Sequence, residues 1–223
     1  MSDVAVRRVD FGWFVRPGEE TGTGLARVEP AYGYLIEHPE GTVLVDTGMG
    51  RHPEVDAHYQ PRRVELGVAL AAVGSSVDRV DRVVNCHLHF DHSGGNPEFA
   101  GRPIFVQRAE LELARNVKWH TLPELVDHPG ARYEVLDGAA EILPGVHIVA
   151  TPGHTAGHQS VVVTGGDGTV IVAGQSHDHA TGFTWDVLAH RTGAVASPDW
   201  IGTLLEFDPK RIVFAHDNAV WIP

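Results

Sequence analysis

The stretch His87-Leu88-His89-Phe90-Asp91-His92 (HLHFDH) directly follows the short apolar strand predicted at Arg82–Asn85 (RVVN). Four of its side chains can bind a metal ion. His87 and His89 point the same way, because side chains of an extended backbone alternate with period two. A turn then brings Asp91 and His92 to a neighbouring position. We interpret the stretch as a site for two adjacent metal ions rather than as a solvated polar loop.

Two further histidines each follow a predicted strand. His154 comes after Gly145–Thr151, and His216 comes after Arg211–Phe214. Taken alone, each would more often be a structural histidine than a ligand. Strand ends gather at the edge of a sheet, so together with HLHFDH we expect both histidines to be ligands.

Regular patterns run on both sides of this stretch and predict two similar halves. Apolar residues at helical spacing predict helices at 64–73 and 200–207, and strands around glycine turns predict hairpins at 31–46 and 159–173. Three stretches remain irregular and are candidate binding loops: 16–30, 49–63 and 116–131. Two sheets packed face to face with helices outside fit this order, in a single α/β domain spanning residues 1–223.

Composition excludes several classes of function. Acidic residues outnumber basic ones by 29 to 17, and the net charge of -12 disfavours nucleic acid as a partner. There is no apolar run long enough for a membrane span and no apolar core of a secretion signal, so we expect a cytoplasmic protein without membrane contact. Cys86 is the one cysteine and cannot form an intrachain disulfide.

Three segments resemble the metallo-β-lactamase superfamily: HLHFDH at 87–92, VLVDTG at 43–48 and TPGHTAGHQS at 151–160. Together they are most similar to the N-acyl-homoserine lactonase, or quorum-quenching, branch. The resemblance implies an αββα sandwich, with two mixed β-sheets and helices on the outer faces. Hydrolases of many substrates share the HxHxDH signature, so it is more specific for the superfamily than for the branch.

The resemblance also implies a set of ligands. One metal would be bound by His87, His89 and His154, and a second by Asp91, His92 and His216. Nitrogen and oxygen donors without sulfur suit zinc, with two ions expected, while manganese, iron and cobalt remain open. Asp46 in VDTG would orient a ligand histidine from behind, or serve simply as a turn residue at a strand end.

The sequence departs from the family at Gln175, in VIVAGQSHDH, where members carry an aspartate that bridges the two metals. Glutamine offers a neutral oxygen and cannot ionise. Three interpretations stay open: hydroxide alone bridges the metals, the second site is weak, or His177, Asp178 or His179 substitutes. In the lactonases a tyrosine near the metals falls about where Asp178 lies.

The expected function is a metal-dependent hydrolase that opens a lactone by attack of a metal-bound hydroxide on the carbonyl. Asp91 would carry the proton to the leaving group. A thioesterase, a β-lactamase-like hydrolase or a biosynthetic enzyme with the altered site is the alternative. A metal-binding protein without turnover is a weaker one, and an iron oxygenase is disfavoured by Gln175. The substrate would be a small lactone or other ester, and a homodimer is one option for assembly.

Aromatic residues mark two candidate substrate entrances. Trp119, His120 and Leu122 lie in one irregular stretch, and Phe183 and Trp185 lie in another. Each group either lines an entrance or simply packs on the surface, and the sequence leaves both interpretations open.

Overall fold

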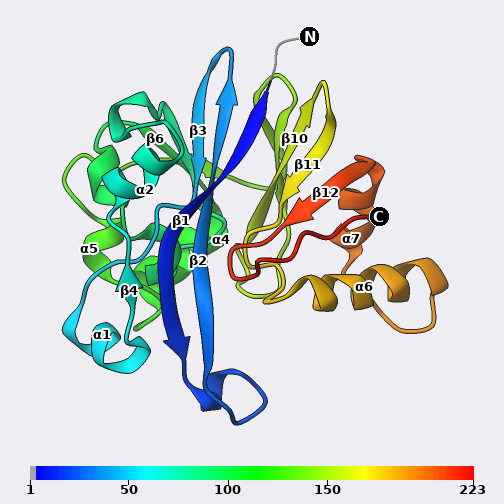
Figure 1. The fold of residues 1–223 in the computed structure, drawn as a ribbon, viewed down its shortest axis with the longest axis horizontal. Helices are drawn as coiled ribbons and strands as arrows, with labels where there is room; N and C mark the ends of the chain where they lie inside the picture. The colour runs from blue at the N-terminus through cyan, green and yellow to red at the C-terminus, as the bar shows by residue number, and fades with distance from the viewer. Residues whose placement is uncertain (1–3) are drawn as a thin grey trace.

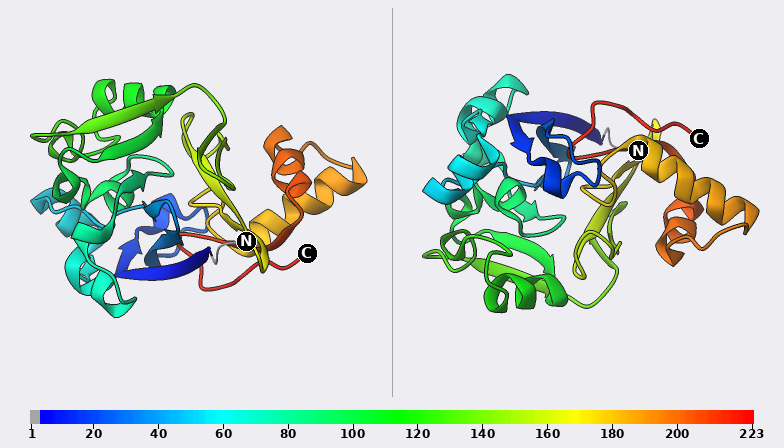
Figure 2. Two further views of the ribbon diagram at one scale, coloured as in Figure 1. Left: turned by 90° about the horizontal axis from the view of Figure 1, so that it is seen from above. Right: turned by 90° about the horizontal axis from the view of Figure 1, so that it is seen from below.

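The computed structural model describes residues 4–223 and contains two β-sheets packed face to face, with helices on their outer sides (Figures 1 and 2). Residues 1–3, the start of the segment inspected for a secretion signal, lie outside the described residues. Each sheet contains both parallel and antiparallel pairs. The predicted αββα sandwich is confirmed. Within the described residues, no helix is both long and apolar enough to cross a membrane.

The larger sheet has seven strands in the order β4-β1-β2-β3-β5-β6-β7. Strand β2 pairs antiparallel with both β1 and β3, while β3, β5, β6 and β7 run parallel. The C-terminal ends of β3 and β5 therefore lie side by side. The strands are β1 Ala5–Arg16, β2 Arg27–His38, β3 Gly41–Val45, β4 Arg62–Arg63, β5 Arg82–Val84, β6 Pro103–Gln107 and β7 Arg132–Leu136.

The smaller sheet has five strands in the order β12-β11-β10-β9-β8. Strands β9 and β11 both pair antiparallel with β10, and β12 is parallel to β11. Consequently β9, β11 and β12 end at the same edge. The strands are β8 Ala140–Leu143, β9 Val146–Ala150, β10 Gln159–Gly165, β11 Gly168–Val172 and β12 Pro209–Val213.

Apolar residues fill the space between the sheets and the space under the helices. In β2, Ile36 faces the other sheet, whereas Leu35 faces the helices. Because both faces of a strand are buried, β2 and β3 read as nearly continuous apolar runs. The helices are α1 Pro53–Tyr59, α2 Leu66–Ala72, α3 Phe90–Ser93, α4 Arg108–Asn116, α5 Pro123–Val126, α6 Ala180–Thr192 and α7 Asp199–Glu206, with 3₁₀ turns at Gly18–Glu20, Val77–Arg79 and Asn96–Phe99.

The three stretches predicted to be irregular are in fact partly ordered. β1 continues to Arg16 and β2 already begins at Arg27, so 16 and 27–30 belong to the strands of a long hairpin, and the connection between them contains the 3₁₀ turn Gly18–Glu20 (Figure 1). Stretch 49–63 contains α1 and β4, and stretch 116–131 contains α5. Helix α6 was not predicted, because buried Phe183 and Val187 alternate with exposed Trp185 and Leu188 and blur the apolar face. The hydrogen bonds that order the hairpin are long-range and leave no local signal.

Candidate metal centre and its cavity

The candidate site lies where strands of both sheets end. Asp46 follows β3, the loop that begins at His87 follows β5, and His154 follows β9. Gln175 and His216 follow the parallel strands β11 and β12. The topology thus brings together residues that are far apart in the sequence.

The HLHFDH loop is fixed by backbone contacts with the segment after β3. The amide of Thr47 donates to the carbonyl of His92 at 2.8 Å, and the amide of Gly94 donates to the carbonyl of Gly48 at 2.8 Å. A Cβ at Gly94 would collide with the backbone of Met49 and Gly50. Glycine at position 94 therefore permits the close approach that holds the ligand loop.

The first candidate ligand group, which we call the histidine triad, consists of His87, His89 and His154. One nitrogen from each lies within 4.8 Å of the others, and Nε2 of His154 is 3.2 Å from Nδ1 of His89. Nε2 of His87 is buried and has no hydrogen-bond partner within the described residues. Burial lowers the pKa of His89 to about 3 and that of His154 to about 4. Neutral imidazoles with an unused buried nitrogen fit a divalent metal ion.

The second group, the aspartate triad, consists of Asp91, His92 and His216, all of them buried. Nε2 of His92 lies 3.1 Å from Nε2 of His216, and Oδ2 of Asp91 lies 3.4 Å from both nitrogens. Nδ1 of His216 donates to the carbonyl of Pro30 at 2.7 Å, which directs Nε2 into the site. One carboxylate and two imidazoles are a donor set that suits zinc.

Asp46 supports the aspartate triad from behind. Nδ1 of His92 donates to Oδ2 of Asp46 at 2.9 Å, and Oδ1 of Asp46 accepts the amide of Cys86 at 2.8 Å. The φ of Asp46 is 62°, in the left-handed region that non-glycine residues adopt at some cost. This backbone conformation places the carboxylate between His92 and the amide of Cys86. Sγ of Cys86 lies 3.2 Å from Nδ1 of His87 and 3.3 Å from Nδ1 of His92, so it contacts one ligand of each triad.

Gln175 directs its side-chain oxygen toward the aspartate triad. Oε1 lies 3.3 Å from Nε2 of His92, and Nε2 of Gln175 donates to Oδ1 of Asp178 at 3.2 Å. The bond to Asp178 determines which end of the amide faces the ligands. Gln175 and Asp178 are therefore the two residues of this loop that the structure brings to the cluster.

The histidines of the same loop point elsewhere. Nε2 of His177 donates to Asp186 in α6 at 2.9 Å, and its ring packs against Phe183. His179 is the residue before α6, and its Nδ1 lies 3.9 Å from Asp217. Neither side chain is among the ligand groups.

Glu110 at the start of α4 was not singled out from the sequence, although it connects three segments of the site. Its Oε1 accepts the amide of Leu88 at 2.9 Å and Nε2 of His120 at 2.7 Å, and its Oε2 accepts the hydroxyl of Thr155 at 2.6 Å. Burial raises the pKa of Glu110, but these hydrogen bonds outweigh burial and the pKa is lowered overall. A glutamate inside an amphipathic helix gives no sign of this role, because surface glutamates share the pattern.

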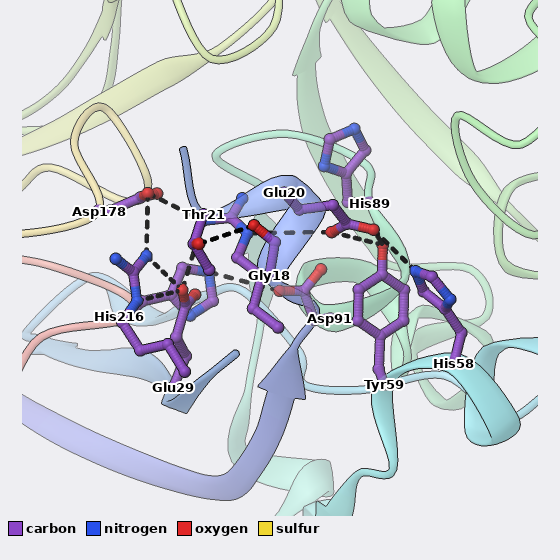
Figure 3. Close-up of polar contacts among 12 residues, drawn as sticks. Gly18, Glu20, Thr21, Glu29, His58, Tyr59, His89, Asp91, Asp178 and His216 are labelled. Atoms are coloured by element: carbon purple, nitrogen blue, oxygen red, sulfur yellow. Dashed lines mark hydrogen bonds and ion pairs between the residues drawn. The ribbon is translucent and has the colours of Figure 1, made fainter. Parts of the chain in front are cut away.

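A cavity of about 440 Å³ opens beside the two triads, with His89 and Asp91 in its wall. Trp119, His120 and Leu122 line this cavity, which agrees with their interpretation as a substrate entrance. Phe183 and Trp185 do not line it: Phe183 is buried and Trp185 is exposed elsewhere. The wall is partly apolar and partly charged, and it consists of Phe14, Arg16, Glu20, Glu54, Val55, His58, Tyr59, His89, Phe90, Asp91, Trp119, His120, Thr121, Leu122 and Gln175. Figure 3 shows Asp91 between the group around Asp178 and the group around Tyr59.

Comparison with known proteins agrees with this architecture. The sequence profile described as "Metallo-beta-lactamase superfamily" matches residues 26–216. An N-acyl homoserine lactonase of a Bacillus species is 38% identical over 150 residues, which cover 60% of this chain and 58% of the relative. The chain thus spans less than two thirds of the length of that lactonase.

Two solved structures cover nearly the whole chain. A quorum-quenching N-acyl homoserine lactone hydrolase is 28% identical with a TM-score of 0.78, covering 98% of this chain and 94% of the other. An N-acyl homoserine lactone hydrolase with the product N-hexanoyl-L-homoserine at its catalytic metal centre is 25% identical with a TM-score of 0.74, covering 98% and 95%.

Proposed function

We propose, from the premise that this chain belongs to the metallo-β-lactamase superfamily, that it is a metal-dependent hydrolase that opens lactone rings, with N-acyl-homoserine lactones as the substrate class. The observation that carries the proposal is the convergence of two ligand triads beneath a partly apolar cavity. The lactonases to which the chain is similar support this substrate class. The cavity provides an apolar wall for an acyl chain beside polar groups for a ring.

The proposal assigns one zinc ion to His87, His89 and His154, and a second to Asp91, His92 and His216. Manganese, iron or cobalt would be accepted by the same donors. When bound, such an ion polarises a carbonyl and lowers the pKa of water. Asp46 holds His92 in the orientation that leaves Nε2 free for the metal.

Asp91 is the proposed proton carrier, since it lines the cavity and belongs to the group proposed to bind the second metal. Burial raises its pKa, but the neighbouring imidazoles of His92, His216 and His89 outweigh burial and keep it well below its usual range. The ionised carboxylate can accept a proton from the attacking water. It can then deliver that proton to the ring oxygen as the ester bond breaks.

A substrate panel tests the proposed function. Zinc-loaded protein is assayed on N-hexanoyl-homoserine lactone, an acyl thioester and a β-lactam, with a chelator-treated sample as control. We expect ring opening of the lactone, loss of the rate after chelation and recovery with added zinc. Turnover of the thioester or β-lactam without the lactone would replace the proposal by the alternative hydrolase. No turnover with both metals bound would favour a metal-binding protein.

A further inference from the structure

Arg16, the last residue of β1, has a place in the cavity that no ligand assignment explains. Its side chain is 15% exposed, and it lines the cavity together with Asp91 and Gln175. Among the described residues of the cavity wall, it is the one lysine or arginine. A permanent cation therefore faces the space where a substrate would meet the proposed metal ligands.

Two carboxylates hold one end of the Arg16 guanidinium. Nη1 donates to Oδ2 of Asp178 at 2.9 Å and to Oε1 of Glu29 at 3.4 Å (Figure 3 shows both carboxylates). Glu29 is almost fully buried, and Asp178 is itself bonded to Gln175. Within residues 4–223, Nε and Nη2 of Arg16 donate no hydrogen bond, and Nε lies 4.0 Å from Glu20. The side chain is thus fixed in position while part of its donor capacity remains available.

Several other polar groups of the wall are already engaged, whereas the neutral hydroxyl of Thr121 has no hydrogen-bond partner within the described residues. His58 and Tyr59 both donate to Glu20, at 2.8 Å and 3.1 Å. His120 donates to Glu110, and the amide nitrogen of Gln175 donates to Asp178. Arg16 is therefore the strongest donor still available to a ligand. Arginine is suited to this task, because its planar fork binds carboxylates and remains charged.

We infer that Arg16 is a substrate-binding residue that donates hydrogen bonds to the ring carbonyl oxygen and then to the carboxylate formed when the ring opens. The inference rests on the proposed function. Water adds to the carbonyl carbon, the ring C–O bond breaks, and the products are an alcohol and a carboxylic acid that releases one proton. Negative charge on the acyl oxygens grows along this course, so Arg16 stabilises the later stages more than the neutral lactone.

Arg27 provides a matched control. Its guanidinium also bonds Glu29 and Asp178, at 2.8 Å and 3.2 Å, but it does not line the cavity. A variant of Arg27 removes a cation from the same carboxylates without removing a donor from the cavity. If an Arg16 variant loses carboxylate binding and an Arg27 variant keeps it, Arg16 binds the carboxylate directly. If both variants lose it, the two arginines act by holding Glu29 and Asp178 in place.

The experiment measures binding of the ring-opened acid N-hexanoyl-L-homoserine and of its uncharged primary amide to zinc-loaded protein. Wild type, R16M, R16K and R27M are compared by calorimetry, and kcat and KM are measured on the lactone. We expect R16M to weaken binding of the acid about tenfold or more, with little change for the amide. R16K should retain part of the acid affinity, and R27M should stay within about threefold of wild type. R16M should also lower kcat, because the stabilised charge develops after substrate binding.

Melting temperature and zinc content show whether each variant is folded, and R16K carries the test if R16M is not. Equal losses in R16M and R27M, or unchanged acid binding in R16M and R16K, would overturn the role of Arg16. If wild type hydrolyses no lactone but still binds the acid through Arg16, the proposed substrate is wrong and the carboxylate-binding role stands.

Discussion

The histidine triad and the aspartate triad lie next to each other, yet their surroundings differ in charge. The histidine triad offers three imidazole nitrogens and no carboxylate. Nδ1 of His87 contacts the thiol of Cys86, and burial raises the pKa of that thiol to about 12. The aspartate triad contains a carboxylate and is held by Asp46 and by the carbonyl of Pro30. Hydrogen bonds therefore assemble the second group, whereas burial, together with repulsion from neighbouring imidazoles, keeps the first group neutral.

The affinity of a triad for metal depends both on how well its side chains are positioned and on how much negative charge it offers, and the two triads differ in both. The aspartate triad is the better preorganised of the two, but Gln175 supplies it with a neutral oxygen where a carboxylate would neutralise a cation. Two divalent ions repel each other, and a neutral amide reduces that repulsion less than a carboxylate does. We expect the second equivalent of zinc to bind at the aspartate triad and to bind more weakly than the first.

Removing a ligand from the histidine triad should have the largest effect. His87→Ala, His89→Ala or His154→Ala leaves two ligands, so metal and activity should be lost together, with a rate at least about 100-fold lower. His216→Ala should instead release one equivalent and leave the histidine triad loaded. Zinc analysis after dialysis, together with lactone assays, checks both. Full zinc content and full rate in any of the three variants would contradict the ligand assignment.

Asp91→Asn tests whether the carboxylate of the aspartate triad does more than bind metal. The amide keeps an oxygen at the site but loses the charge and the ability to carry a proton. We expect kcat to fall about 100-fold, with a melting temperature close to that of wild type. Near wild-type turnover on a lactone would rule out the proton-carrying role.

Asp46→Asn should weaken the aspartate triad alone. Asparagine tolerates the left-handed backbone at this position, so the fold should be retained. Losing the charge behind His92 should lower affinity for the second zinc equivalent at least about tenfold, while the first equivalent is unaffected. Competitive metal titration measures the two equivalents separately. Equal weakening of both would mean that Asp46 acts through the loop as a whole.

Gln175→Asp should give the smallest change and should strengthen binding. A carboxylate beside His92 should raise affinity for the second equivalent about tenfold. Titrations of wild type and variant side by side provide the measurement, with Gln175→Asn as an uncharged control. If wild type already binds two equivalents of zinc as tightly as Gln175→Asp does, another group supplies the missing charge. Asp178, which is bonded to Gln175, is the first candidate.

The sequence predicted both hairpins and the two packed sheets, because each has a local pattern. It also predicted that HLHFDH contributes several side chains to one cluster, while their role as metal ligands stays a prediction. The arrangement of the triads required the resemblance, since no spacing reveals that β9, β11 and β12 end at one edge. Arg16, Glu29 and Glu110 were missed for a related reason. Their partners lie in other parts of the chain. The long pairing of β1 with β2 places Arg16 at the cavity, with Glu29 bonded to it, in a stretch predicted to be irregular.

Glu110 also has a consequence for local opening of the folded chain. Its carboxylate is the common acceptor for the segments that contain Leu88, His120 and Thr155. Separating any one of these segments leaves the same buried charge short of a donor, and the cost falls on all three. The segments should therefore open as one cooperative unit, with shared protection of their amides against hydrogen exchange. Residues that lie far apart in the sequence would then unfold and refold together at this edge of the sheets.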